Sequence, residues 1–166
     1  MNTLFPDLLT AILAVLLIIA AVVDIRTFTI SNRLVIAVAL LAPLFWLAAG
    51  IPLWPDAAYR IAIAAAVFVG LAATFYLGMM GGGDVKLAAA LALWFSPAST
   101  IKFLVIMSLA GGLLTVVVLI LHRLKARRAP LPEGEKDQAK PEVPYGVAIA
   151  IGALWILAQR FLNQFA

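Results

Sequence analysis

Long apolar runs separated by short polar segments organise this chain. The runs cover six segments, namely residues 8–23, 34–49, 59–77, 84–95, 101–121 and 143–162. A helix needs about 20 apolar residues to cross a hydrocarbon core of about 30 Å, and most of these runs approach that length. The pattern therefore predicts an all-α, polytopic membrane protein with about six transmembrane helices.

Turn-forming residues mark the places where the runs are interrupted. Ser31 or Asn32 can cap the second helix, and Pro43 inside that helix predicts a kink. Residues 123–142 are charged, rich in proline and without apolar period, which is typical of a solvated linker. We therefore expect one transmembrane domain over residues 1–166, with a cytoplasmic linker at 123–142 before the last helix.

Composition narrows the classes of function. The chain is 65% hydrophobic and 12% charged, and its basic residues flank apolar runs, so we expect the lipid bilayer and no nucleic acid as a partner. It contains no cysteine, which excludes disulfides and thiol nucleophiles. It has a single histidine, His122, so a cluster of His and Cys ligands is excluded too. We expect neither a metal nor a cofactor.

The distribution of Lys and Arg predicts how the chain crosses the membrane. With the N-terminus outside, nine of the twelve basic residues lie on the cytoplasmic side, and only Arg60, Lys102 and Arg160 lie outside. The opposite arrangement would invert this ratio, against the positive-inside rule. We therefore expect both termini outside.

One acidic residue stands out because of its depth. Asp84 follows three glycines and opens an apolar run of only twelve residues, about 18 Å of helix. Either a helix begins upstream through the glycines, or Asp84 starts a short helix below the membrane surface. In both cases an ionised group is costly there and needs a partner. Asp24, at the end of the first run on the same side, is the partner we expect.

Two carboxyl groups at this depth have a specific chemistry available. Of eight acidic residues, only Asp24 and Asp84 lie at the inner ends of apolar runs. Such a pair tends to share one proton, so one group can accept a proton from water while the other donates to a substrate. This chemistry hydrolyses a peptide bond without a metal, thiol or serine.

The same residues resemble a known family. Gly81-Gly82-Gly83-Asp84 resembles the GxGD signature of intramembrane aspartyl proteases, and residues 81–87 are similar to the type IV prepilin peptidase branch. The resemblance implies that Asp24 and Asp84 are catalytic, with Gly81, Gly83 and Lys86 as supporting motif residues. Pro144-Tyr145-Gly146 resembles the family's last-helix motif, through Pro144 and Gly146.

The resemblance also implies a substrate and a location. Family members cleave the leader peptide from prepilin-like proteins at the cytoplasmic face of the bacterial inner membrane, after a small residue and before the substrate's hydrophobic helix. Because this chain lacks the cysteine-rich loop of the larger members, it resembles the short form associated with Flp/Tad pili, and methyl transfer is not expected.

Other interpretations use the same residues differently. An aspartate at a helix end is often a capping residue, and Lys86 is well placed to reach the lipid head groups. A small transporter or channel component could use Asp24 and Asp84 as a proton or cation relay. A third interpretation is a non-catalytic subunit of a secretion machine.

Overall fold

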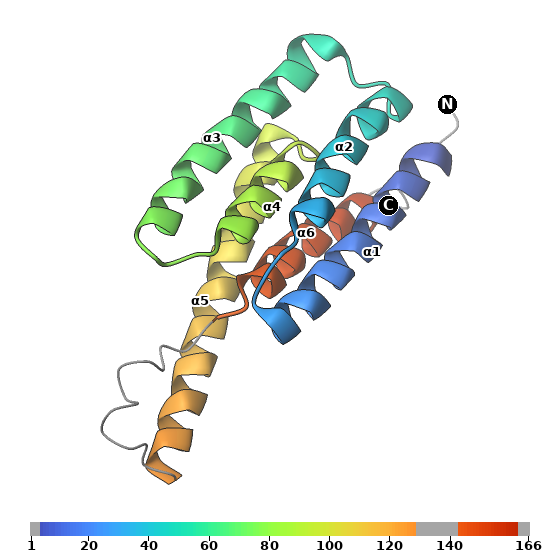
Figure 1. Ribbon diagram of the computed structural model, residues 1–166. Helices are drawn as coiled ribbons and strands as arrows, with labels where there is room; N and C mark the ends of the chain where they lie inside the picture. The colour runs from blue at the N-terminus through green and yellow to red at the C-terminus, as the bar shows by residue number, and fades with distance from the viewer. Residues whose placement is uncertain (1–3, 129–142, 163–166) are drawn as a thin grey trace.

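The structure, a computed structural model, describes residues 4–128 and 143–162. Within these ranges the chain is a bundle of six helices without strands (Figure 1). The helices are α1 (Leu4–Thr27), α2 (Asn32–Ala48), α3 (Ala58–Tyr76), α4 (Gly82–Ala92), α5 (Pro97–Arg128) and α6 (Tyr145–Leu162). The all-α prediction is confirmed.

Four of the described helices, α1, α3, α5 and α6, are long and apolar enough to cross a membrane. The apolar helix α2 is shorter, and α4 has 11 residues, which rise about 16 Å against a hydrocarbon core of about 30 Å. The chain is therefore a multi-pass membrane protein in which α4 is too short to cross by itself.

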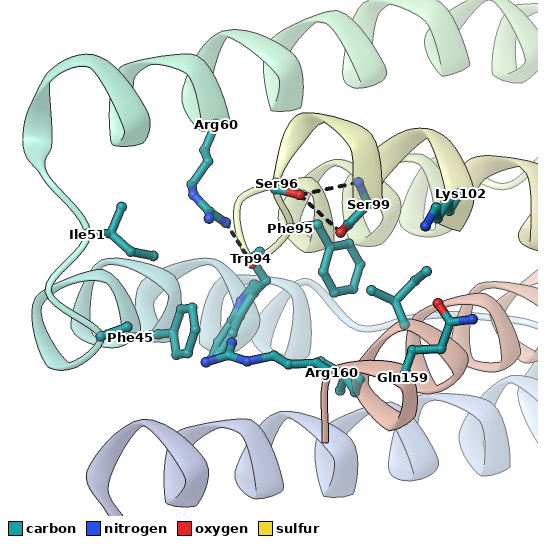
Figure 2. Close-up of a pocket in the computed structure, with 13 residues that line it drawn as sticks. Phe45, Ile51, Arg60, Trp94, Phe95, Ser96, Ser99, Lys102, Gln159 and Arg160 are labelled. Carbon is teal, nitrogen blue, oxygen red and sulfur yellow. Dashed lines mark hydrogen bonds between the residues drawn. The ribbon is translucent and has the colours of Figure 1, made fainter. Parts of the chain in front are cut away.

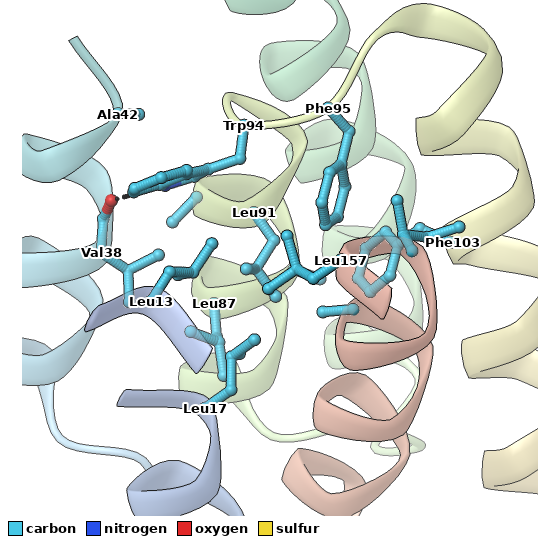
Figure 3. Close-up of a cluster of buried hydrophobic side chains, with 14 of the residues drawn as sticks. Leu13, Leu17, Val38, Ala42, Leu87, Leu91, Trp94, Phe95, Phe103 and Leu157 are labelled. Carbon is cyan, nitrogen blue, oxygen red and sulfur yellow. Dashed lines mark hydrogen bonds between the residues drawn. The ribbon is translucent and has the colours of Figure 1, made fainter. Parts of the chain in front are cut away.

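The short helix α4 lies at the centre of the bundle, in contact with α2, α3 and α6 (Figure 1). Its residues from Leu87 to Ala92 are all buried, as expected for a helix that is apolar on every side. Leu13 and Leu17 of α1 pack against it in the core shown in Figure 3. The position of α4 fixes the depth of whatever its ends carry.

Two tryptophans attach the end of α4 to α2. The indole N–H of Trp94 donates to the Val38 carbonyl oxygen at 2.9 Å (Figure 3), and that of Trp46 donates to the Leu93 carbonyl oxygen at 2.9 Å. Trp94 also stacks on Phe45, with ring centroids 5.0 Å apart. These bonds satisfy the indole donors inside an apolar core.

The long helix α5 departs from the predicted boundaries. The apolar run ends at Leu121, but the helix continues to Arg128 because Leu, Lys, Ala and Arg are strong helix formers. The predicted linker 123–142 therefore starts too early, and its remainder from residue 129 to 142 lies outside the described residues. With 32 residues α5 is about 48 Å long, and it projects beyond the other helices (Figure 1).

Two glycines mark the α5–α6 contact, one on each helix. Of the adjacent pair Gly111 and Gly112, Gly111 is buried against α6, where a Cβ would lie 3.5 Å from the Tyr145 ring and 3.6 Å from the Ala148 Cβ, whereas a Cβ on Gly112 would meet nothing within 4 Å. The tight approach is at Gly152 of α6, where a Cβ would lie 3.1 Å from the Met107 nitrogen and the Phe103 oxygen. Gly112 instead faces open space.

Candidate active site

Asp24 lies on the buried face of α1. The buried positions of this helix include Leu13, Leu17, Ala20 and Asp24, which recur every three or four residues. Only 2% of the Asp24 surface is exposed. The carboxyl group therefore points into the bundle and not toward lipid.

The start of α6 holds this carboxyl group. The backbone N–H of Gly146 donates to Asp24 Oδ2 at 2.7 Å, and the backbone N–H of Val147 also interacts with the carboxylate. The Val147 N–H also donates to the Pro144 carbonyl oxygen at 3.2 Å, whereas the Gly146 amide has no partner within the helix and is free to bind an anionic group. A Cβ on Gly146 would lie 2.8 Å from Oδ2, so only glycine allows this approach.

Sequence reasoning gave Pro144 and Gly146 no chemical role, and the structure supplies one for Gly146. Pro144 directly precedes α6, which begins at Tyr145, two residues after the predicted start at residue 143. A Pro-x-Gly segment at the start of a helix places an unhindered amide in the first turn. This pattern was the sequence signal from which an anion-binding role for Gly146 could have been predicted.

Asp84 occupies the third position of α4, which begins between the two predicted alternatives, at Gly82. Gly81 precedes the helix in an extended conformation, and Asp84 reaches back to interact with the Gly81 backbone N–H. A Cβ on Gly81 would lie 2.8 Å from Asp84 Oδ2. The other oxygen, Oδ1, is buried and has no hydrogen-bond partner among the described residues. Since burying a polar atom without a partner is costly, this oxygen is available to water or substrate.

The structure brings Asp24 and Asp84 together. They are the only buried acidic side chains in the part of the chain that the structure describes, and they interact electrostatically. They come from the end of α1 and the start of α4, which lie at the same end of the bundle (Figure 1). The predicted convergence of two carboxyl groups sixty residues apart is therefore present.

The α1–α2 loop packs between the starts of α4 and α6. A Cβ on Gly83 would lie 2.9 Å from the Ile30 carbonyl oxygen, and one on Gly146 would lie 2.9 Å from Ile30 Cδ1. Ser31 then caps α2 by accepting from the Leu34 N–H, one of the two predicted caps. The glycines at 83 and 146 thus let three backbone segments meet beside the carboxyl groups.

Lys86 lies two residues after Asp84, on the exposed side of α4. Its Nζ donates to the Asn32 side-chain oxygen at 3.1 Å, and both side chains are exposed. Lys86 therefore links α4 to the start of α2.

A pocket of about 390 Å³ adjoins the carboxyl pair, and we call it the Gly112 pocket. It reaches the glycine segment before Asp84 through Met80, and the start of α6, which holds Asp24, through Tyr145. Its lining residues are Leu71, Thr74, Met79, Met80, Met107, Ser108, Gly111, Gly112, Thr115 and Tyr145. A separate apolar pocket of about 370 Å³, which includes Gly70, lies further along α3 and α5.

The chemistry of the site rests on its carboxyl groups. No group of three or more His, Cys, Asp or Glu side chains within residues 4–128 and 143–162 is arranged to hold a metal ion. A buried carboxyl pair inside a membrane bundle is typical of proton relays and of intramembrane aspartic peptidases.

Comparison with protein families decides between these two classes. Residues 11–116, which include Asp24, Asp84 and the glycines before Asp84, match the type IV leader peptidase family. The match covers more than half of the chain, so the chain belongs to this family. The protein is therefore an aspartic endopeptidase, and family membership implies cleavage of leader peptides from prepilins. Comparisons with curated proteins and with solved structures give no match.

Proposed function

We propose that this protein cleaves the leader peptide from a prepilin-like substrate of the Flp/Tad type, with Asp24 and Asp84 as its catalytic pair. The observation that carries the proposal is their arrangement. Two buried carboxyl groups from different helices interact electrostatically, and Asp84 Oδ1 is left without a partner among the described residues.

The contacts of each aspartate support a division of roles. Asp24 accepts the Gly146 N–H at 2.7 Å, whereas Asp84 interacts with the Gly81 N–H and leaves Oδ1 without a partner among the described residues. The negative charge is then placed on Asp24 and the shared proton on Asp84. Asp24 then accepts a proton from a water molecule as its oxygen attacks the scissile carbonyl carbon, and Asp84 donates its proton to the carbonyl oxygen. The C–N bond breaks when the leaving nitrogen receives a proton from the pair.

The Gly112 pocket fits the part of the substrate that follows the cut. It adjoins Asp84 through Met80, and methionine side chains adapt to varied apolar partners. The hydroxyl groups of Ser108 and Tyr145 have no hydrogen-bond partner in the described chain. A peptide must open its helical hydrogen bonds to be cut, so its freed backbone groups need such partners inside a membrane.

The distribution of basic residues and the lack of cysteine extend the proposal to the side of the membrane where cleavage occurs and to methyl transfer. The carboxyl pair faces the cytoplasm of a bacterial inner membrane, because the end of the bundle that carries it also carries most Lys and Arg residues. The enzyme is a short form without methyltransferase activity, because the chain has no cysteine and no cysteine-rich loop. The new N-terminus of the product should then have the mass of an unmethylated residue.

Substitution of the two aspartates tests the proposal in a cleavage assay with a co-expressed Flp-type prepilin. Asp24→Asn and Asp84→Asn should each reduce cleavage by about 10²-fold to 10⁴-fold, the usual contribution of general acid–base catalysis. The double variant should be no worse than either single variant, because the pair acts as a unit.

The matched control is Asp56→Asn, an exposed acid at the other end of the bundle, which should cleave normally. Near wild-type cleavage by Asp24→Asn, with Asp84→Asn inactive, would leave a mechanism with one carboxyl group and contradict the proposal.

A further inference from the structure

A cavity of about 560 Å³ lies at the opposite end of the bundle from Asp24 and Asp84 (Figure 2). It is placed where α4 ends and α5 begins. Because α4 has only 11 residues, the end of α2 and the start of α3 continue past its last turn (Figure 1), and the cavity lies beside that turn. The proposed peptidase chemistry makes no use of this cavity.

Three basic side chains from three different helices line the cavity. They are Arg60 of α3, Lys102 of α5 and Arg160 of α6, the same three residues that depart from the Lys and Arg bias of the rest of the chain. Figure 2 shows Arg60 and Arg160 both directed toward the turn at Trp94. Three residues separated by up to 100 positions thus converge on one recess.

No carboxylate compensates these charges at close range within the described residues. Asp56 interacts with Arg60 and Asp7 with Arg160 without forming an ion pair, and neither acid lines the cavity. Arg60 and Arg160 also repel each other. Like charges gathered in a recess of a membrane protein favour a bound anion.

The hydrogen-bond donors of these side chains are mostly unused. Arg60 Nη1 donates to the Trp94 carbonyl oxygen at 2.8 Å and so caps the end of α4 (Figure 2), and the Arg160 guanidinium lies 4.6 Å from the centre of the Phe45 ring. An arginine has five N–H donors and a lysine three, and the described residues accept only this one bond from the three side chains. An anion with several oxygen atoms would satisfy the others.

The mixture of charged and apolar side chains in the lining indicates which kind of molecule contains that anion. Besides the basic residues and two serines, Ser96 and Ser99, the lining includes the apolar side chains of Phe45, Phe95 and Ile156. A free phosphate ion would gain nothing from the apolar part. A phospholipid presents both a phosphate and an apolar body, and a recess at one end of a transmembrane bundle lies at head-group depth.

We propose that this cavity binds the head group of an anionic phospholipid, with its phosphate held by Arg60, Lys102 and Arg160. The apolar side chains of the lining contact the glycerol and upper acyl region. The bound lipid neutralises the three charges and joins α3, α5 and α6 at the end of the bundle remote from the carboxyl pair.

The test compares lipid binding by the full-length chain and its variants in nanodiscs. The lipid is either phosphatidylcholine alone or phosphatidylcholine with phosphatidylglycerol, and the measurements are the melting temperature and the lipids retained in native mass spectrometry. The main variants are Lys102→Gln and Lys102→Gln combined with Arg160→Gln. Arg60 is left in place because its removal would uncap α4.

Wild type should melt at a higher temperature with phosphatidylglycerol and should retain it in preference to phosphatidylcholine. Each charge removed should weaken this preference about fivefold, the effect of one basic residue near an anionic membrane. Arg123→Gln makes the same kind of charge change on an exposed side chain of α5 remote from the cavity, and it should keep the preference of wild type.

Three outcomes would overturn the proposal. The first is a wild type that shows no preference for phosphatidylglycerol. The second is a Lys102→Gln, Arg160→Gln double variant that keeps the full preference. The third is equal stabilisation by inorganic phosphate in phosphatidylcholine nanodiscs, which would assign the cavity to a free anion.

Discussion

The contact between Asp24 and Gly146 shows how one missing side chain permits a site. The carboxyl group of Asp24 in one helix accepts the Gly146 N–H of another at 2.7 Å, and this is possible because position 146 carries no Cβ. Gly83 serves the same purpose toward the loop at Ile30, since a Cβ there would lie 2.9 Å from a backbone oxygen that cannot move easily. Both glycines act by close approach and not by flexibility.

The first prediction at this scale concerns Gly146. Gly146→Ala should lower the cleavage rate by about 10²-fold, because displacing a catalytic group by about 1 Å has an effect of that size. The protein should still insert and accumulate, as judged by its amount in purified membranes. Gly70→Ala is the matched control, since a Cβ there meets nothing within 4 Å and the residue lies in the separate pocket, and it should cleave normally. Equal activities of the two variants would remove the proposed role of the Gly146 amide.

At the scale of the elements, the length of α4 has two consequences. Its first turn carries Asp84 beside Asp24, and its last turn ends about 16 Å away, short of the far end of the bundle. At that buried end, the Leu93 carbonyl oxygen accepts the Trp46 indole N–H and the Trp94 carbonyl oxygen accepts an Arg60 N–H. The Trp94 indole N–H donates in turn to α2. One short helix thereby positions a carboxyl group at one end of the bundle and opens the cationic cavity at the other.

The second prediction concerns the Gly112 pocket, which is lined mainly by α3 and α5. Gly112→Leu should fill the Gly112 pocket and exclude apolar substrate residues, each worth about 1.5–3 kcal/mol of burial, so cleavage should fall roughly tenfold to a hundredfold. Gly70→Leu makes the same change in the separate pocket along the same two helices, where a Cβ also meets nothing within 4 Å. It should cleave at the wild-type rate. A similar loss in both variants, or in neither, would show that the Gly112 pocket does not receive the substrate.

For the whole molecule, the separation of charge is the main feature. Arg26, Arg33, Lys86, Arg123 and Lys125 lie at the end of the bundle that holds the carboxyl pair, while Arg60, Lys102 and Arg160 lie at the other end (Figure 1). By the positive-inside rule we expect the carboxyl pair to face the cytoplasm. This orientation agrees with cleavage on the side where the substrate is made.

The third prediction tests that orientation. The chain contains no cysteine, so a single introduced one can be labelled by a thiol reagent that does not cross the cytoplasmic membrane. Leu53→Cys, at an exposed position between α2 and α3, should label in intact cells. Lys125→Cys, near the end of α5, should label only after the membrane is opened. The reverse pattern would place the carboxyl pair outside.

Several features of the protein followed from the sequence alone. The long uninterrupted apolar runs indicate transmembrane helices, which satisfy their backbone hydrogen bonds internally, so the fold class and the approximate ends of the helices could be predicted. The positions of Asp24 and Asp84 at the same end also followed, because each closes or opens an apolar run. The end of α5 at Arg128 could not be predicted from the apolar run, which stops at Leu121, because the charged residues that follow are themselves strong helix formers.

Other features were decided by the tertiary structure. The helix α1 carries Leu, Ile and Val on all of its faces. No periodicity in its sequence therefore marks the face that carries Leu13, Leu17 and Asp24 into the core. The amide that binds Asp24 comes from a residue 122 positions away, and nothing local to either residue records that contact. The same holds for Arg60, Lys102 and Arg160. The sequence marks them only as the three basic residues on the opposite side from the other nine. Their convergence depends on where α4 ends among longer helices, and that is a property of packing.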